Sequence, residues 1–197
     1  MPKIQTKRLA EHRDWRRHQL IEAAASIALE SGGSAITVAL VAERAGLSRT
    51  SVYEYFSSSE DLVADLVLDE LHNFIEVLTN AIGDQDDCAK AISQWIEAAL
   101  RYISDGRHML AKALSSISTP RERAAEIGAA HRALLAPLAH SLKRMGVVDI
   151  SQAMALIQSA TDVATKRIES GTNAEEEIAS TTAFCLAGLK AVIESSR

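Results

Sequence analysis

The sequence predicts an all-α protein. Apolar residues recur at steps of three and four through almost the whole chain, and no segment shows a convincing alternation of apolar and polar residues. Glycines and short polar segments divide this pattern into about nine expected helices. We therefore expect three N-terminal helices in one small unit, joined through a fourth helix to a larger helical body.

Three helices are expected in the first 56 residues. The first covers about 13–30 and is followed by Gly32 and Gly33, which are stop signals. Thr37 can cap a second helix that ends near residue 45, and Ser48 can cap a third that ends near residue 55. One face of the first helix is apolar and consists of Leu20, Ala24, Ile27 and Ala28. This face can share a small core with Val41, Ala42, Leu47 and Val52.

A long fourth helix is expected to begin near Ser57, which stands at capping-box spacing from Glu60, and to end at the polar segment 83–87. We place the domain boundary within this helix, so that residues 1–60 form one domain and residues 61–197 form the other. The apolar stripe of this helix consists of Val67, Leu71, Phe74, Leu78 and Ile82. Five further helices are expected over about 87–104, 106–117, 120–145, 150–170 and 174–195.

The composition is that of an ordinary globular protein with an uneven distribution of charge. Hydrophobic residues make up 47% and charged residues 24% of the 197 residues, and the net charge is −5. Residues 1–56 carry +2 and residues 57–197 carry −7, while the first twenty residues alone carry +4. A basic N-terminal arm on an acidic body would direct that end of the protein toward phosphates.

Several other classes of protein are disfavoured. No apolar run of bilayer-spanning length and no signal peptide is expected, which predicts a cytoplasmic protein without a membrane partner. Cys88 and Cys185 are far apart and are expected to be buried free thiols. The six histidines form no i, i+4 pair, and the common catalytic and phosphate-binding motifs are absent from the sequence. We therefore expect no metal site, no cofactor and no enzymatic activity.

Residues 37–56, TVALVAERAGLSRTSVYEYF, have the spacing of a helix-turn-helix. Gly46 breaks the chain between two short helices, and AGLS gives a connection of three or four residues. The third helix can then expose Arg49, Thr50, Ser51, Glu54 and Tyr55. Arginine and hydroxyl side chains can bond to base edges, and tyrosine hydroxyls can reach phosphates. A plain helical hairpin would show the same spacing, so both interpretations stay open at this point.

The stretch from residue 17 to residue 62 resembles the N-terminal domain of the TetR family of transcriptional regulators. RHQLIEAA (17–24) resembles the start of the family's first helix, and Gly32 falls at the family's glycine. TVALVAERAGLS (37–48) and SVYEYF (51–56) resemble its helix-turn-helix, and SSSEDL (57–62) resembles the start of its fourth helix. The C-terminal two-thirds of the chain carries no such motif.

The resemblance implies which residues contact DNA. Residues 49–51 match the base-facing end of the recognition helix, and the two tyrosines match positions that contact the phosphate backbone. The candidate DNA-binding residues are Arg17, Thr37, Ser48, Arg49, Thr50, Ser51, Tyr53 and Tyr55. The chain departs from the family at Ser59, where a lysine is usual, and this removes one expected phosphate contact.

The resemblance also implies a homodimer built on the helices expected over 150–170 and 174–195. Its two recognition helices would meet a palindromic double-stranded DNA operator roughly 34 to 36 Å apart. The helices between about 87 and 170 should enclose a pocket for a small-molecule effector. Pro137 should bend the helix over 120–145, which can leave room for a ligand or simply wrap a core. Candidate pocket residues are Trp95, Tyr102, Met109, His131, Met154 and Gln158.

We therefore expect a DNA-binding transcriptional regulator, and in particular a repressor that a small molecule releases from its operator. The alternative is an all-helical regulatory or interaction protein of the same fold that has lost DNA or ligand binding. The basic arm, Tyr53 and Tyr55 argue against this alternative, whereas Ser59 keeps it open.

Overall fold

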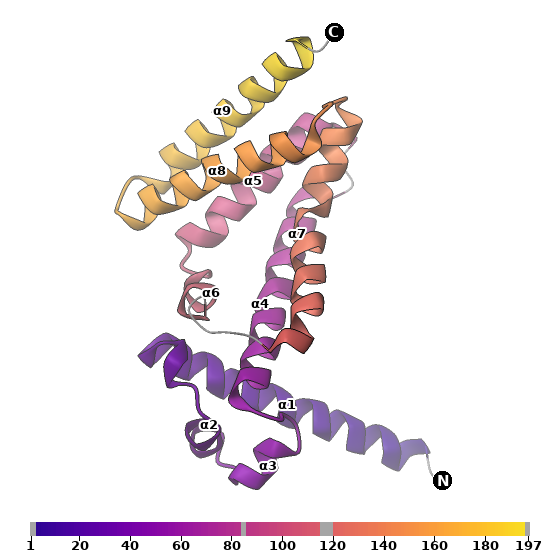
Figure 1. Ribbon diagram of the computed structural model, residues 1–197, viewed down its shortest axis with the longest axis vertical. Helices are drawn as coiled ribbons and strands as arrows, with labels where there is room; N and C mark the ends of the chain where they lie inside the picture. The colour runs from indigo at the N-terminus through magenta and orange to yellow at the C-terminus, as the bar shows by residue number, and fades with distance from the viewer. Residues whose placement is uncertain (1–2, 84–85, 115–119, 196–197) are drawn as a thin grey trace. The chain divides into compact units, whose positions relative to one another are not determined.

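The structure, a computed structural model, describes residues 3–83, 86–114 and 120–195, and the side chains only from residue 11 onward. Within these ranges the chain forms nine α-helices and two short 3-10 helices, and it contains no strand (Figure 1). The predicted all-α fold class is confirmed.

Two compact units make up the chain. The first consists of Met1–Glu70 and Met109–Gly128, and the second of Leu71–His108 and Ala129–Arg197. Two helices, α4 (Ser59–Ile82) and α7 (Ala124–Arg144), pass from one unit into the other. The segment from 109 to 128 thus belongs with the N-terminal helices, a grouping that the local sequence pattern does not indicate.

In the first unit, α1 (Lys3–Ser31), α2 (Val38–Arg44) and α3 (Arg49–Tyr53) surround one core. The predicted apolar face of the first helix is buried, and α6 (Met109–Leu114) adds Leu114 to the same core. The prediction that the first helix starts near Arg13 is wrong, because α1 extends back to Lys3. Residues 3–12 have no apolar stripe but are mostly residues of high helix propensity, which explains the longer helix.

Two of the three predicted helix caps in this unit are confirmed. Thr37 Oγ1 accepts a hydrogen bond from the backbone N–H of Leu40 at 3.2 Å, and Ser48 Oγ accepts one from that of Ser51 at 3.1 Å. The cap predicted at Ser57 is displaced by one residue. Ser58 Oγ instead accepts from the N–H of Asp61 at 3.1 Å, and Asp61 reaches back to Ser57.

The second unit is a helical body in which α5 (Cys88–Ser104) packs against α8 (Ile150–Glu169) and α9 (Ala174–Ser195). Its core includes Leu78, Ile92, Ile96, Leu100, Leu138 and Leu142. The start of the helix predicted at residue 120 is wrong. A 3-10 turn over Arg121–Arg123, which follows Pro120 and belongs to the first unit, precedes α7, and Pro137 lies inside α7 as predicted. The helix predicted over 106–117 is limited to Met109–Leu114 in the described part of the chain.

One expectation about membranes needs correction. By length and composition α9 is apolar enough to cross a bilayer, although a core helix of a soluble protein meets the same criterion. In this structure α9 packs along α5 and α8 and buries Ile178, Cys185 and Leu189. Burial raises the pKa of the Cys185 thiol, so this cysteine is an inert core residue, while Cys88 is half-buried.

Candidate nucleic-acid interface

The turn between α2 and α3 depends on Gly46. Its φ of 66° lies in the left-handed region, which a residue with a Cβ adopts only under strain. The N–H of Gly46 donates to the carbonyl of Glu43 at 3.1 Å, and the N–H of Leu47 donates to that of Ala42 at 2.8 Å. These two bonds form a Schellman motif, which satisfies the last carbonyls of α2 and turns the chain sharply into α3.

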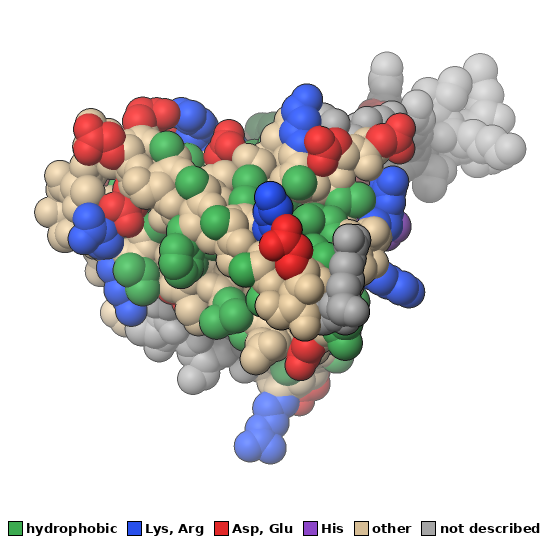
Figure 2. All heavy atoms as spheres, turned by 90° about the horizontal axis from the view of Figure 1, so that it is seen from above, with side chains coloured by type: hydrophobic (Ala, Val, Ile, Leu, Met, Phe, Trp, Pro, Cys, Tyr) green, Lys and Arg blue, Asp and Glu red, His purple; other side chains and the backbone are tan. Residues whose placement is uncertain are grey.

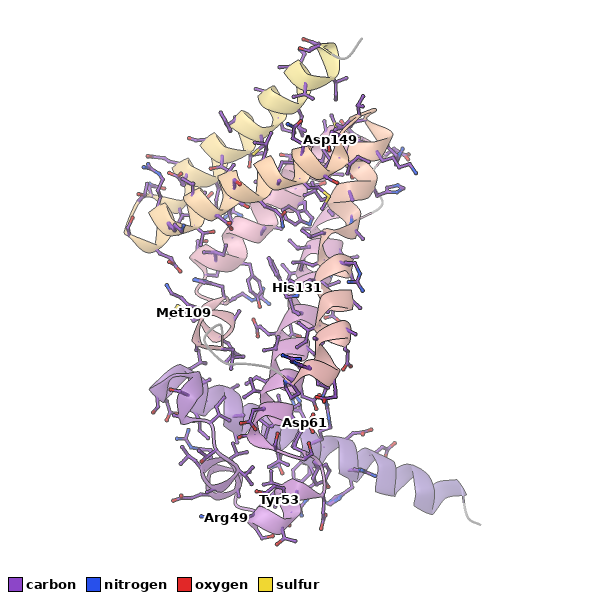
Figure 3. The ribbon with its side chains drawn as sticks, viewed as in Figure 1. Arg49, Tyr53, Asp61, Met109, His131 and Asp149 are labelled. Carbon is purple, nitrogen blue, oxygen red and sulfur yellow. The ribbon has the colours of Figure 1, made fainter. Side chains whose placement is uncertain are left out.

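The short helix α3 is held by its apolar side and exposes the other. Val52 is fully buried, and Phe56, whose N–H donates to the carbonyl of Val52 at 3.0 Å, is also buried. Arg49 and Thr50 are exposed, and 58% of Tyr53 is accessible to solvent. Figure 3 shows Arg49 and Tyr53 on α3 at the surface of this unit. Cationic, hydroxyl and phenolic groups are thus presented together on one short helix.

The hydroxyls near the helix starts already have partners within the chain. Ser48 Oγ lies 2.9 Å from Ser51 Oγ in addition to capping α3, and Thr37 caps α2. A hydroxyl has one donor and two acceptor positions, so these residues retain capacity for a further bond. Tyr55 is half-buried, with the guanidinium of Arg13 lying 5.9 Å from its ring centroid.

Arg17, a candidate DNA contact, lies in an internal ion pair. Its guanidinium bonds to Asp65 of α4 and lies 5.8 Å from the ring centroid of Phe56. About 42% of its side chain is exposed, so a phosphate could still approach it. The position joins α1, α4 and the end of the helix-turn-helix.

At Ser59, where the resemblance leads one to expect lysine, the local charge is negative. Ser59 Oγ donates to Glu60 at 3.2 Å. The pKa of Glu60 is lowered by its own backbone N–H and by the hydroxyls of Ser58 and Ser59. Position 59 therefore carries no cation, whereas Arg13 and Arg49 are exposed cationic side chains of the same unit.

An exposed ion pair ties the end of α1 to the end of α2. Arg44 donates to both carboxylate oxygens of Glu30, at 2.7 and 2.8 Å, and to the hydroxyl of Ser26. The hydroxyl of Ser26 also donates to Glu30 at 2.8 Å. The hydrogen bonds from Arg44 first, and then from Ser26, lower the pKa of Glu30 from 4.5 to about 2. The pair helps to hold the helix-turn-helix against α1.

The lowered pKa gives a pH prediction for Arg44→Gln. Because Glu30 titrates at a lower pH in the folded protein than in the unfolded chain, the pair stabilises the fold fully above pH 4.5. The difference in free energy of unfolding between wild type and Arg44→Gln should therefore be constant from pH 7 to about pH 5 and should disappear as the pH approaches 2. Urea unfolding at a series of pH values measures this difference, and a difference that grows on acidification would contradict the assignment.

The candidate effector residues lie in different environments. Trp95 is buried and donates to the carbonyl of Leu134 at 3.4 Å, and Tyr102 is buried and stacks on Phe74 with ring centroids 4.5 Å apart. Met109 belongs to the first unit and is exposed. The remaining candidates belong to the second unit. Met154 packs on its core, whereas His131 and Gln158 are exposed.

A separate apolar hollow lies between α8 and α9 and includes Leu156, Phe184, Gly188 and Val192. None of the candidate effector residues lines it. The described residues contain no group of three or more His, Cys, Asp or Glu side chains arranged to hold a metal ion.

Comparisons with known proteins agree with this geometry. Residues 20–66 match the family model described as bacterial regulatory proteins, tetR family. A curated relative, an uncharacterised HTH-type transcriptional regulator YfiR of Bacillus subtilis, is 30% identical over 101 residues. That alignment covers 51% of this chain and 49% of the relative, so the chain matches about half the length of that relative.

Several solved structures share the fold over nearly their whole length. FadR of Bacillus subtilis, in complex with stearoyl-CoA, has a TM-score of 0.71 at 21% identity, with 87% of this chain and 98% of that chain covered. The fatty acid degradation regulator FadR of Bacillus halodurans has a TM-score of 0.70 at 18% identity, covering 87% and 94%. PfmR of Thermus thermophilus, a TetR-family regulator, has a TM-score of 0.68 at 24% identity, covering 85% and 97%.

Proposed function

Since residues 20–66 carry the N-terminal domain of the tetR family, we propose that this DNA-binding transcriptional regulator is a cytoplasmic repressor that acts as a homodimer. In this proposal the dimer binds a palindromic operator, and a small molecule bound to the second unit releases it. In this proposal the first compact unit binds DNA, and the second unit binds the effector and mediates dimerisation.

The observation that carries the proposal is the exposed polar surface of α3. The helix is fixed from behind by Val52 and Phe56 and is entered through a glycine turn, so its exposed side chains are held on a rigid support. Arg49 can make bidentate bonds to guanine, and Tyr53 can bond to a phosphate oxygen. A recognition helix in the major groove needs this combination of a fixed backbone and exposed polar groups.

Dimerisation is supported by apolar side chains that α8 and α9 leave exposed. Leu156 and Phe184 are 61% and 73% accessible, and Val163 and Val192 are also exposed. Figure 2 shows hydrophobic side chains lying between charged ones on one face of the molecule. Large apolar side chains grouped on a surface mark interaction sites, and homodimer interfaces are more apolar than the rest of a surface. A second copy of the chain would cover them.

Effector binding is supported by polar atoms of the second unit that lack partners. Gln94 Oε1 and His108 Nδ1 are buried without a hydrogen bond among the described residues, whereas His108 Nε2 bonds to Glu169 at 2.9 Å. Buried polar atoms are nearly always paired, so a polar group of a ligand could satisfy either of them. Arg107 lies over the ring of nearby Tyr102 at 4.6 Å and could pair with an anionic group.

Ligand-dependent release follows from linkage. A ligand that binds better to a body conformation in which the two recognition helices are wrongly spaced must lower the affinity for an operator. The solved FadR of Bacillus subtilis, which has the same fold, binds stearoyl-CoA, so a small-molecule effector is compatible with this architecture.

The proposal is tested by selection of DNA from a random duplex pool with the purified protein. The expected product is a two-fold symmetric consensus whose half-sites are one helical turn apart. Recovery of sequences without a consensus would contradict the assigned function, and a consensus without symmetry would contradict the dimeric mode of binding.

Replacing Arg49 by Ala should relax sequence preference at one position in each half-site. The expected loss is about 1–3 kcal/mol of discrimination between the preferred base and the others, because a bidentate arginine contact is removed. Selection with the variant measures the change, and a consensus identical to that of wild type would show that Arg49 does not read a base.

Replacing Tyr53 by Phe should weaken binding to all DNA sequences alike. The phenolic hydroxyl is the only group removed. The expected loss in binding free energy is that of one hydrogen bond, about 0.5–1.5 kcal/mol. Titration of the variant with the selected duplex and with an unrelated duplex measures both affinities. A changed sequence preference with unchanged overall affinity would contradict the phosphate assignment.

A further inference from the structure

Arg123 lies where three acidic side chains converge in the first unit. It is the last residue of the 3-10 turn before α7, and its side chain is 22% exposed. Its Nη1 donates to Asp61 at 2.7 Å, its Nη2 to Asp65 at 2.5 Å, and its Nε to Glu126 at 2.8 Å. The hydrogen bonds to Asp65 first, and then to Glu126 and Asp61, outweigh burial and raise the pKa of Arg123.

Asp61 connects Arg123 to the end of the helix-turn-helix. Its second oxygen accepts from both the backbone N–H and the hydroxyl of Ser57, each at 3.0 Å. Ser57 directly follows Phe56, whose N–H bonds to Val52 at the end of α3. Burial raises the pKa of Asp61, but the bonds from Ser57 and Arg123 outweigh it and the net effect is a lowered pKa. Asp61 is therefore ionised at neutral pH and accepts from both sides.

Asp65 connects the same arginine to α1. Its side chain is only 9% exposed, and it bonds to Arg17 as well as to Arg123. A carboxylate this deeply buried needs cationic partners. Asp61 and Asp65 lie one helical turn apart on α4, so the loss of Arg123 would leave their two negative charges close together with only Arg17 to compensate them. Arg17 in turn lies over Phe56. Arg123 is thus the cation shared by the two carboxylates of α4 that contact α1 and the turn after α3.

We infer that Arg123 is a positioning residue for DNA binding, which acts through Asp61 on the turn at Ser57 and so fixes the end of the recognition helix. This inference rests on the proposed function. It gives the segment before α7 a direct influence on operator affinity, and α7 continues along the chain into the second unit at Ala129. Arg123 acts on DNA binding only indirectly and does not itself contact DNA.

The first test compares Arg123→Gln with Arg121→Gln. Arg121 belongs to the same 3-10 turn, is exposed and has no ion pair among the described residues, so its replacement removes the same charge without breaking the cluster. The probe is the duplex that wild-type protein selects from a random pool. Arg123→Gln should bind it about tenfold more weakly than Arg121→Gln does, the equivalent of 1.4 kcal/mol. Equal affinities of the two variants would overturn the inference.

A purely structural role would give a different result. In that case Arg123→Gln would lower the melting temperature, but the folded variant, measured well below that temperature, would bind DNA like Arg121→Gln. Circular dichroism establishes the folded state before each titration. If Arg123→Gln does not fold, Arg123→Lys takes its place. Lysine keeps the charge but cannot bridge both aspartates as a planar fork, so binding should be several-fold weaker than wild type, and wild-type affinity would overturn the inference.

The route through Asp61 is tested by a double-mutant cycle with Asp61→Asn. If Arg123 acts through Asp61, Arg123→Gln should change operator affinity much less in the Asp61→Asn background than in wild type. Independent, additive losses would contradict this route. Absence of selective DNA binding by wild type would refute the proposed function itself, whereas selective wild-type binding with equal Arg123→Gln and Arg121→Gln affinities refutes only the role of Arg123.

Discussion

Replacing Phe184 by Asp is expected to convert the proposed dimer to a monomer and to weaken operator binding by at least about a hundredfold, since the two half-sites are then bound independently. Phe184 lies on α9, is 73% exposed, and lines the apolar hollow together with Leu156 and Val192. In a symmetric dimer the new carboxylates would be buried in an apolar interface without partners, at a cost of several kcal/mol. Light scattering measures the mass, and titration of the selected duplex measures the affinity.

The matched control for this variant is Val148→Asp. Val148 is 79% exposed in the connection between α7 and α8, so the same charge is added to an exposed apolar position outside the α8–α9 hollow. This variant should retain twice the mass of one chain and wild-type affinity. If Phe184→Asp remains a dimer, the face that includes Phe184 is not the interface.

Replacing Phe56 by Ala is expected to destabilise the first unit by about 3–5 kcal/mol, the usual cost of truncating a buried aromatic side chain. Phe56 is 2% exposed, packs in the core with Val52 and Leu62, and supports the guanidinium of Arg17. Because Phe56 packs in the same core as Val52 of α3 and bonds to its carbonyl, loss of this packing should also reduce DNA binding. Urea unfolding followed by circular dichroism measures the stability.

Phe56→Leu provides the comparison. Leucine keeps most of the apolar volume, so the expected loss is less than about 1.5 kcal/mol, with DNA binding largely retained. If Phe56→Ala were as stable as Phe56→Leu, the packing role assigned to the ring would be wrong.

Local sequence predicted the helix-turn-helix well because its determinants are close together in the chain. Thr37 and Ser48 cap helices through bonds to residues three positions ahead, and Gly46 closes α2 through bonds to its own last turn. Such features require no knowledge of the rest of the fold. The apolar face of the first helix was predicted equally well, because apolar residues that recur with the helical period of 3.6 residues identify the buried side directly.

The start of α4 was predicted one residue out, and the reason lies elsewhere in the chain. Ser57, Ser58 and Ser59 are chemically equivalent caps, so local sequence cannot choose among them. In the structure Asp61 pairs with Arg123, 62 positions away, and its other oxygen holds Ser57. Ser58, rather than Ser57 or Ser59, caps α4 in a structure where Asp61 also bonds to Ser57 and to the distant Arg123. The spacing of the three serines alone does not predict this.

Part of the candidate site could be predicted from local sequence, and part depends on contacts between distant segments. The exposed residues of α3 follow from the helical period once Val52 is placed in the core, whereas the ion pair of Arg17 with Asp65 depends on how α1 packs on α4. The candidate effector residues are large or polar side chains on apolar helical faces. That criterion cannot separate a core tryptophan such as Trp95 from a ligand contact, because both lie on the apolar side of a helix.

Whether α3 is the recognition helix of a DNA-binding regulator can be decided by two affinities of the wild-type protein, measured at one salt concentration. One is measured with the duplex selected from a random pool and the other with a scrambled duplex of equal length and composition. If α3 reads DNA sequence, the selected duplex should bind at least about a thousandfold more tightly than the scrambled one. Equal affinities for the two duplexes would show that α3 is not a recognition helix.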